Sequence, residues 1–261
     1  MPDAARQHDL TGKSAVITGA ASGMGRATAI LLAAHGTRLA LADINLPGAE
    51  QVARQIVDSG GQAFAIKADV TKKADVDALV AAAVQHYGRL DIMGNIAGMS
   101  EGRYAIADMP EETFDRVMAI NLKSAFFGCQ AALPVMMRQR SGVIINIASS
   151  AIDLNFPGSS SYSIAKAGVA MLTKIAAAEA APYGIRVNAI APGWVESGFT
   201  RKNAVSEQEW EALKQRTVGS IPLKVLGQPE HIAQTILFLV SDAAAYVTGQ
   251  DIRVNGGTSM V

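Results

Sequence analysis

Short apolar runs rich in Val, Ile and Leu alternate along this chain with longer Ala-rich stretches. The short runs predict strands at about 13–18, 37–42, 62–68, 90–96, 142–148, 185–191 and 249–254. The longer stretches predict helices at about 23–35, 47–59, 74–87, 111–138, 160–183 and 229–240.

The apolar runs are continuous rather than alternating, which indicates strands buried on both faces, as in a parallel sheet covered by helices. Repeated strand–helix units of this kind build an α/β fold of the Rossmann-type, doubly wound class. We therefore expect about seven parallel strands with helices on both faces. No linker or composition shift divides the chain, so we expect one domain over residues 10–261 after a flexible tail at 1–9.

The composition suits a large core and argues against several classes of function. Of the 261 residues, 49% are hydrophobic and 18% are charged, and 23 basic side chains balance 23 acidic ones. No basic cluster is present, which argues against a nucleic-acid partner. The single cysteine, Cys129, lies beside Phe126 and Phe127 and is expected to be a buried apolar residue rather than a nucleophile. The four histidines are scattered without ligand spacing, so we expect no metal.

The sequence also predicts a cytoplasmic protein with no membrane partner. Residues 1–9 are polar and lack the apolar core of a signal peptide. The apolar run at 236–240 is far shorter than the roughly 18 residues that span a bilayer.

The first predicted strand leads through Thr18-Gly19-Ala20-Ala21-Ser22-Gly23-Met24-Gly25 directly into a helix. Glycines leave room for a phosphate to approach the main chain. A helix N-terminus offers N–H donors and the positive end of its dipole to a pyrophosphate. The same loop could be a purely structural turn, but its place at the start of a strand–helix–strand unit favours dinucleotide binding.

Asp43 ends the second predicted strand, where an acidic residue can accept hydrogen bonds from the adenine ribose hydroxyls. Its charge would repel a 2′-phosphate, and neither Ser22 nor the pair Ile44 and Asn45 supplies a cation for one. The pattern therefore favours NAD over NADP. The alternative is that Asp43 is a turn or N-cap residue before the helix that begins near Pro47.

The next two strand ends carry weaker signals. Asp69 and Val70 end the third strand, where an adenine ring could lie, although Asp69 could equally cap the following helix. The fourth strand ends in Asn95-Ile96-Ala97-Gly98. These small residues leave room for a ligand at the carboxyl end of the sheet or simply form a turn.

Tyr162 and Lys166 are four residues apart, so on a helix they lie one turn apart on the same face. A cation within about 4–6 Å lowers the pKa of a phenol by about 1–3 units from its usual value near 10. Such a pair also occurs as an ordinary surface pairing. Ser149 ends the fifth strand and could meet Tyr162, or be a turn residue. Asn121 interrupts an apolar helix and could hold a water, or mark a helix irregularity.

Taken together, these motifs resemble the short-chain dehydrogenase/reductase family over residues 10–257. Residues 18–25 match its Thr-Gly-x-x-x-Gly-x-Gly loop, 162–166 match its Tyr-x-x-x-Lys pair, and 192–193 match its Pro-Gly turn. The resemblance implies a catalytic set of Asn121, Ser149, Tyr162 and Lys166. It also implies a cofactor site formed by Gly19, Ser22, Gly23, Met24, Gly25, Asp43, Ile44, Asp69, Val70, Asn95, Ala97, Gly98, Tyr162, Lys166, Pro192, Gly193, Val195 and Ser197.

Three positions depart from the commonest pattern of the family. Ile96 replaces a second asparagine, Ser197 stands where a threonine usually contacts the nicotinamide carboxamide, and Asn255 replaces an acidic residue. None of the three touches the proton path that the family implies.

The resemblance implies an NAD(H)-dependent oxidoreductase that interconverts a secondary alcohol and a ketone. Tyr162 would exchange a proton with the substrate oxygen while hydride moves between the substrate carbon and nicotinamide. Lys166 would lower the pKa of Tyr162 and bind the nicotinamide ribose. Ser149 would position the substrate oxygen, and Asn121 would secure a water that links Lys166 to solvent.

The sequence leaves the substrate open among a small alcohol, a sugar or polyol, a hydroxyacyl group and a cyclic alcohol. The family closes its pocket with the segment after the Pro-Gly turn, here 194–222, where Phe199, Val205 and Trp210 could face substrate or pack a helix on the core. Four apolar residues suggest a partly apolar wall between Ser149 and Tyr162: Ile152, Leu154, Phe156 and Pro157. Asp153 and Asn155 could add polarity there.

Three other functions stay open. An NADPH-dependent 3-oxoacyl reductase would have the same motifs but expects a basic residue near the ribose. A nucleotide-binding regulator usually lacks the tyrosine or the lysine, and a methyltransferase gives no reason for the spacing of Ser149, Tyr162 and Lys166. The stretches 111–138, 160–183 and 246–261 resemble the family's tetramer interfaces, so we expect a homotetramer.

Overall fold

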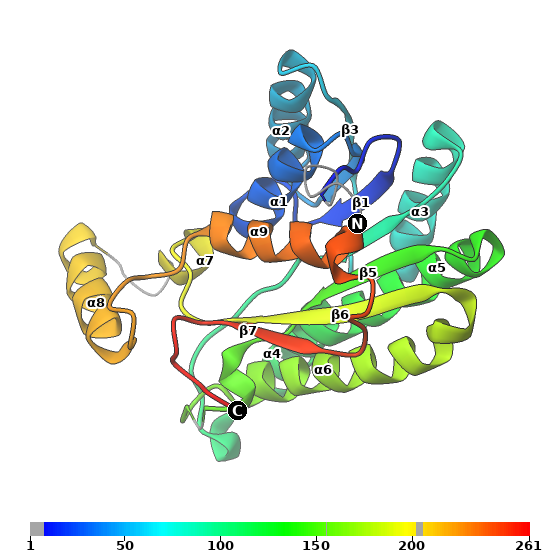
Figure 1. Cartoon of the computed structure of the whole chain (residues 1–261). Helices are drawn as coiled ribbons and strands as arrows, with labels where there is room; N and C mark the ends of the chain where they lie inside the picture. The colour runs from blue at the N-terminus through cyan, green and yellow to red at the C-terminus, as the bar shows by residue number, and fades with distance from the viewer. Residues whose placement is uncertain (1–7, 155, 202–205) are drawn as a thin grey trace.

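Seven strands form one parallel sheet within residues 8–154, 156–201 and 206–261, the part of the chain that the computed structural model describes (Figure 1). They are β1 (Ser14–Thr18), β2 (Arg38–Asp43), β3 (Gln62–Lys67), β4 (Ile92–Asn95), β5 (Gly142–Ile147), β6 (Ile185–Pro192) and β7 (Asp251–Val254). Their order across the sheet is β3-β2-β1-β4-β5-β6-β7. This order confirms the doubly wound, Rossmann-type prediction. Most of the predicted N-terminal tail, Asn155, Val205 and the side chain of Phe199 lie outside the described part.

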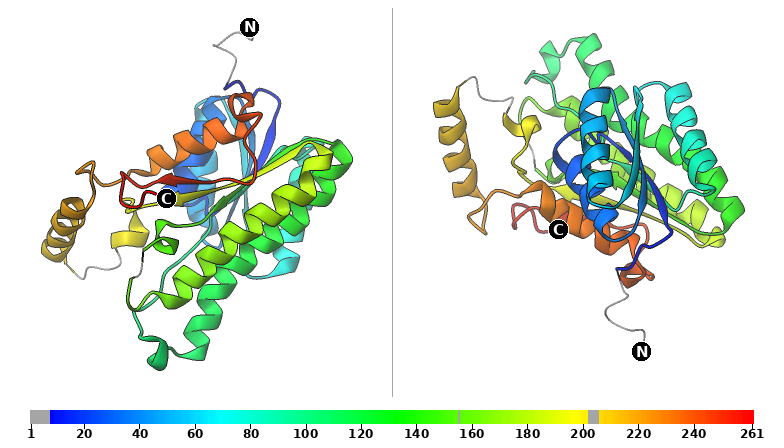
Figure 2. Two further views of the ribbon diagram at one scale, coloured as in Figure 1. Left: turned by 60° about the horizontal axis from the view of Figure 1, so that its bottom comes forward. Right: turned by 90° about the horizontal axis from the view of Figure 1, so that it is seen from above.

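Helices cover both faces of the sheet, as Figure 2 shows from two further directions. One layer holds α1 (Gly23–Ala34), α2 (Leu46–Asp58) and α9 (Pro229–Val240), and the other holds α3 (Lys73–Tyr87), α5 (Ser124–Gln139) and α6 (Ser160–Ala180). Because side chains alternate across a strand, Ala15 and Ile17 of β1 pack into the first layer and Val16 into the second. Burial on both faces is the reason that the inner strands, such as β1 and β5, are largely apolar.

The order in which successive strands are added to the sheet reverses between β1 and β4. The chain runs outward from β1 to β3 and then crosses back, so that Ala15 to Ile17 of β1 pair with Ile92 to Gly94 of β4. In open α/β sheets, ligands bind outside the carboxyl ends of the strands at such a switch point. The fold therefore predicts a ligand crevice at the ends of β1 and β4.

The predicted helix at 111–138 is interrupted. It consists of α4 (Glu111–Met118), a π-helical turn η3 (Ala119–Lys123) and α5. Asn121 Nδ2 donates to the carbonyl of Val117 at 2.9 Å, and Ser124 Oγ donates to that of Ile120 at 2.5 Å. These side chains lie at the π turn and bond to its main chain, and such turns are frequent at functional sites. The prediction of one uninterrupted helix is wrong, whereas the irregularity at Asn121 is confirmed.

The described part of the predicted substrate segment at 194–222 contains two further helices, which the predicted helix ranges did not include. They are α7 (Gly198–Arg201) and the polar helix α8 (Glu207–Ser220), which lies at one edge of the molecule (Figure 1). Short 3-10 turns complete the described elements: η2 (Ile106–Asp108), η4 (Ser150–Ile152), η5 (Ala181–Tyr183) and η6 (Asp242–Ala244). None of the described helices is long and apolar enough to cross a membrane.

Candidate active site

A cleft of about 420 Å³ opens at the carboxyl ends of the strands around the switch point. With one exception, every residue predicted for catalysis or cofactor binding lines it, from Gly19 on the first loop to Ser197 after β6. The sequence reasoning missed eight further lining residues: Ala68, Thr71, Ile96, Ile120, Ile147, Ala148, Gly198 and Thr200. Most of them are small or apolar, a type that gives no chemical signal in a sequence.

The exception is Asn95. Its side chain is buried beneath the cleft, where Nδ2 donates to Asn146 Oδ1 at 2.8 Å. Asn146 Nδ2 in turn donates to Thr173 Oγ1 at 2.9 Å. Asn95 therefore ties β4 to β5 and, through Asn146, to α6, and its side chain lies outside the cleft lining.

The glycine loop is shaped by close main-chain contacts. Gly19 has φ +68° and Gly23 has φ +52°, a region that favours glycine. A Cβ on Gly25 would overlap the carbonyl oxygen of Gly19 and lie 2.7 Å from its carbonyl carbon. The loop thus folds back on itself at the start of α1, and it presents main chain and a helix N-terminus to the cleft. This is the arrangement that holds a pyrophosphate.

Asp43 supports this loop from the end of β2. One carboxylate oxygen accepts the N–H of Ala21 at 3.0 Å and the other accepts that of Asn45 at 2.9 Å. The N-cap of α2 is Asn45, whose Oδ1 accepts the N–H of Gly48. The N-cap alternative for Asp43 is therefore wrong. Asp43 lies in the cleft wall with its charge next to the glycine loop.

Asp69 also lies in this half of the cleft, and its carboxylate serves a local turn. Oδ1 accepts both the N–H and the hydroxyl of Thr71, at 3.0 and 2.6 Å. The hydroxyl bond, helped by the charge of Lys72, lowers the pKa of Asp69 despite its partial burial. The alternative that Asp69 caps α3 is not realised, because the helix begins after Lys72.

Thr18 links the two halves of the cleft at the switch point. Its hydroxyl donates to the carbonyl of Gly94 at 3.2 Å and accepts the N–H groups of Ile96 and Ala97 at 3.0 and 3.1 Å. The end of β1 therefore fixes the path of the chain after β4. This bond also explains how Ile96, which departs from the family pattern, is held without a polar side chain of its own.

Ser149, Tyr162 and Lys166 meet in the other half of the cleft. The hydroxyl of Ser149 hydrogen-bonds to that of Tyr162, and Lys166 Nζ lies 5.7 Å from the centre of the tyrosine ring. Lys166 is only 3% exposed, and its Nζ donates to the carbonyl of Ile147 at 2.7 Å. A side chain so buried is not an ordinary surface partner. The surface-pairing alternative for Tyr162 and Lys166 is wrong.

Asn121 fills the space behind this group. Its Nδ2 donates to the carbonyl of Met99 at 2.7 Å, and its Oδ1 accepts the N–H of Met99 at 3.2 Å. A Cβ on Gly98 would lie 3.0 Å from Asn121 Oδ1 and 3.4 Å from Lys166 Nζ. The π turn thus brings Asn121 against the same glycine that borders Lys166.

Burial sets the protonation of the two central groups. Desolvation lowers the pKa of Lys166 from 10.5 to about 7. Desolvation also raises the pKa of Tyr162 above 10, and the hydrogen bond with Ser149 offsets only part of that rise. The expected lowering of the Tyr162 pKa by Lys166 is not seen, because desolvation of the phenol outweighs the bond with Ser149 and the lysine is not among the causes of the shift.

A Lys166→Met variant is expected to gain stability that depends on pH. The folded-state pKa of Lys166 lies below its unfolded value, so the unfolded chain binds more protons between about pH 7 and 10.5, and the contribution of Lys166 to stability rises with pH there. The gain from removing the buried charge should be largest at pH 6 and shrink by pH 9. Urea unfolding of both proteins at pH 6, 7.5 and 9 measures it. If the difference in unfolding free energy between Lys166→Met and the wild type did not change with pH, the lowered pKa of Lys166 would be contradicted.

The residues after β6 form part of the cleft wall. Thr200 Oγ1 donates to the carbonyl of Val195 at 2.9 Å and accepts the N–H of Ser197 at 3.1 Å. This bonded turn holds Ser197 in the cleft wall. Trp210 does not reach the cleft. It is 4% exposed and borders a separate small cavity with Trp194 and Leu226, so its role is to pack α8.

Comparisons with known proteins agree with this geometry. A family model described as "Enoyl-(Acyl carrier protein) reductase" matches residues 19–259. The 3-oxoacyl-[acyl-carrier-protein] reductase FabG of Staphylococcus epidermidis is 42% identical over 252 residues, which cover 95% of this chain and 99% of that protein. The protein of the same name from Thermotoga maritima is 38% identical over 248 residues, with coverage of 95% and 98%.

Two solved structures extend the likeness to the whole fold. A short-chain type dehydrogenase/reductase from Mycobacterium marinum superposes with a TM-score of 0.92 at 34% identity, covering 99% of this chain and 100% of that one. Levodione reductase superposes with a TM-score of 0.90 at 34% identity, covering 95% and 97%. From the cleft, the motifs and these matches together, we conclude that the chain belongs to the short-chain dehydrogenase/reductase family, whose members are oxidoreductases that bind a nicotinamide cofactor.

Proposed function

We propose that this protein transfers hydride reversibly between NAD(H) and a 3-oxoacyl or 3-hydroxyacyl compound, with Tyr162 as the general acid and base. The observation that carries the proposal is that Ser149, Tyr162 and Lys166 converge in the same cleft as the glycine loop and Asp43. A dinucleotide fits these residues, because Gly19, Gly23 and Gly25 carry no side chains and leave their main chain open to a pyrophosphate at the start of α1.

The cofactor would lie along the cleft between Asp43 and Ser197 and supply the hydride. Tyr162 holds its proton at neutral pH, because burial raises the pKa of its phenol. It is therefore set to donate that proton to a ketone oxygen, which is the reducing direction. Ser149, already bonded to Tyr162, would hold the same substrate oxygen, and general acid catalysis of this kind contributes about 10²- to 10⁴-fold.

Lys166 and Asn121 would restore the proton to Tyr162. A pKa of about 7 lets Lys166 both take up and release a proton near neutral pH. Asn121 borders the same glycine as Lys166 and bonds to the main chain of Met99, which does not line the cleft. These contacts support a relay in which Asn121 holds the path and Lys166 carries the proton.

The relatives favour a 3-oxoacyl substrate over an unspecified secondary alcohol, because the two FabG proteins match nearly the whole chain. The decisive experiment follows NADH oxidation with acetoacetyl-coenzyme A, levodione and simple cyclic ketones. The proposal expects kcat/KM for the acetoacetyl thioester to exceed that for the other ketones by at least about tenfold, or 1.4 kcal/mol. A preference for a simple or cyclic ketone would move the assignment to a general alcohol dehydrogenase.

Asp43 supports NADH as the cofactor rather than NADPH. Lys166 is the only lysine, arginine or histidine among the described residues that line the cleft, and it lies in the other half. We expect Asp43→Asn to raise the ratio of NADPH to NADH kcat/KM by about 10- to 100-fold, because like charges brought together cost several kcal/mol. Initial rates with both cofactors measure the ratio. Asp58→Asn, at the end of α2, is the control and should leave it unchanged. A wild-type protein that prefers NADPH would refute the role of Asp43.

We also propose that the protein is a homotetramer. Large apolar side chains are exposed along two adjacent helices, at Phe126 on α5 and at Ile164, Met171 and Ile175 on α6. Light scattering after size exclusion should give about four times the 27.2 kDa chain mass. A mass of one chain would contradict the assignment.

A further inference from the structure

The turn that carries Ser149 is fastened at both ends. Ser149 caps the 3-10 turn η4, and its Oγ accepts the N–H of Ala151 at 3.1 Å. Asp153 is the residue that ends the same turn. The position of the Ser149 hydroxyl therefore depends on what holds Asp153.

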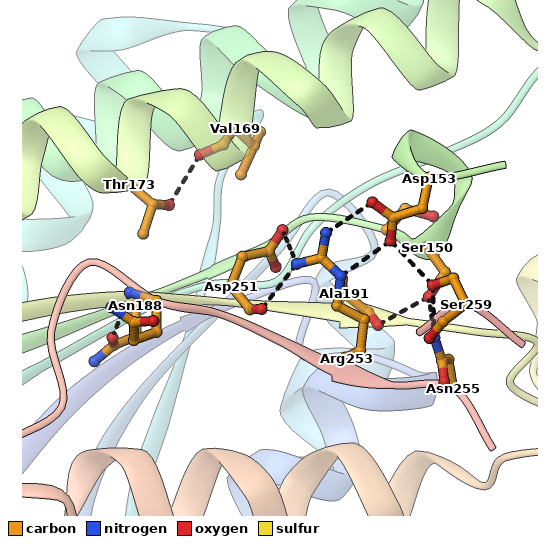
Figure 3. A network of polar contacts seen from close by, with 12 residues as sticks. Ser150, Asp153, Val169, Thr173, Asn188, Ala191, Asp251, Arg253, Asn255 and Ser259 are labelled. Atoms are coloured by element: carbon orange, nitrogen blue, oxygen red, sulfur yellow. Dashed lines mark hydrogen bonds and ion pairs between the residues drawn. The ribbon is translucent and has the colours of Figure 1, made fainter. Parts of the chain in front are cut away.

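Asp153 forms a bidentate ion pair with Arg253 of β7, far away in the sequence (Figure 3). Arg253 Nη2 donates to Oδ1 at 2.7 Å, and Nε donates to Oδ2 at 3.0 Å. Ser259 Oγ adds a third bond to Oδ2 at 3.0 Å. The two charged side chains are 10% and 22% exposed, so water screens the pair weakly. A paired fork of this kind fixes direction as well as distance.

Arg253 is held in turn by its own strand. Its Nη1 donates to the carbonyl of Asp251 at 2.8 Å and lies 2.9 Å from Asp251 Oδ2. The bond from Arg253 lowers the pKa of Asp153, whereas burial raises that of Asp251. Asp153 is thus the carboxylate that keeps its charge more firmly, and it is the main partner of Arg253.

Asn255 makes a second connection to the same turn. Its Nδ2 donates to Ser150 Oγ at 3.1 Å and to Ser259 Oγ at 2.9 Å, and Ser150 Oγ donates to the carbonyl of Ala191 at 3.2 Å. A carboxylate, which the family more often has here, could not donate these bonds. Asn255 also backs the cleft wall, since a Cβ on Gly193 would lie 2.8 Å from its Cα.

We infer that Asp153 and Arg253 form a positioning clamp through which the C-terminal strand sets the place of Ser149 in the cleft. Neither residue lines the cleft, so both act through the turn. The clamp also corrects the expectation that Asp153 adds polarity to the substrate wall, because its carboxylate is engaged by Arg253 and Ser259. This inference rests on the proposed role of Ser149 in binding the substrate oxygen.

The test replaces Arg253 by lysine, which keeps the charge and loses the fork. We expect Arg253→Lys to lower kcat by about tenfold or more, since displacement of a reacting group by about 1 Å costs up to about 10²-fold. The KM and the fluorescence-titrated Kd for NADH should stay the same, because the glycine loop and Asp43 belong to other elements. In a Ser149→Ala background, the same substitution should lower kcat by less than about twofold, since coupled sites are not additive.

Arg89→Lys is the matched control. Arg89 makes an equivalent fork with Asp91 at the opposite end of the sheet, with Nε to Oδ2 at 2.7 Å and Nη2 to Oδ1 at 2.6 Å. It should lower the unfolding temperature as Arg253→Lys does and leave kcat unchanged. Loss of kcat in Arg253→Lys alone therefore separates positioning from general stability.

Two outcomes overturn the clamp. One is wild-type kcat in a folded Arg253→Lys protein, and the other is the same loss of kcat with and without Ser149. If Ser149→Ala is too slow to assay, Asp153→Asn takes its place. The loss of kcat in the Asp153→Asn, Arg253→Lys double variant should then be smaller than the product of the two single losses. Fully additive losses in activation free energy would reject the clamp. Failure of the proposed function looks different, because Tyr162→Phe would then turn over like the wild type.

Discussion

Tyr162→Phe is expected to lower kcat for ketone reduction by about 10²- to 10⁴-fold, the usual contribution of a positioned general acid. Phenylalanine keeps the ring and removes only the hydroxyl that hydrogen-bonds to Ser149. Binding of NADH should therefore survive, and the loss should appear in kcat rather than in the Kd for the cofactor. Steady-state rates with the acetoacetyl thioester and fluorescence titration of NADH measure the two quantities.

Tyr183→Phe is the control for this experiment. Tyr183 is exposed in η5, where Arg140 lies 5.9 Å from the centre of its ring, and it is remote from the cleft lining. Its variant should turn over at the wild-type rate. Near-wild-type turnover of Tyr162→Phe would remove Tyr162 from the proton path and with it the proposed function.

Gly25→Ala is expected to have the second large effect, on cofactor binding. The new Cβ would overlap the carbonyl oxygen of Gly19 and lie 3.2 Å from Ala20 Cα, so the loop main chain has to move. Overpacking of this kind costs about 1–3 kcal/mol. Because the displaced main chain forms the proposed pyrophosphate site, the Kd for NADH should rise by at least about tenfold, which corresponds to 1.4 kcal/mol.

Gly219→Ala, near the end of α8, provides the comparison. A Cβ at Gly219 would have no heavy atom within 4 Å, so the NADH affinity and the stability of the Gly219→Ala variant should stay close to those of the wild type. Thermal unfolding and NADH titration of both variants distinguish a local effect on the loop from a general effect of adding a methyl group. Unchanged NADH affinity in Gly25→Ala would show that the loop does not hold the cofactor.

The sequence was a good guide where local pattern and burial agree. Each strand was predicted to within about two residues at either end, and the inner strands such as β1 and β5 are largely apolar because they are buried on both faces. The residues predicted from their spacing to bind the cofactor and to act in catalysis all line one cleft, except Asn95. Asn95 lies outside the lining because a motif gives the residue at the end of a strand and not the direction in which its side chain points.

The polar helix α8 was missed for a related reason. Its only fully buried side chains are Trp210 and Thr217, so it has no apolar face of the usual width. The sequence allowed Trp210 either to face the substrate or to pack a helix on the core. In the structure it borders a small cavity with Trp194 and Leu226, so it packs α8 on the core.

The sequence by itself determined the fold class, the family and the identity of Ser149, Tyr162 and Lys166 as a group, because helical spacing and strand-end positions are local properties. Only the tertiary structure decided the pKa shifts of Tyr162 and Lys166 and the contacts that hold the turn carrying Ser149 in place. Burial raises the pKa of Tyr162 and lowers that of Lys166, and the expected lowering of the tyrosine pKa by the lysine is absent. The contact between Asp153 and Arg253 joins positions far apart in the sequence, and it exists only because β7 pairs with β6 beside the turn that follows β5.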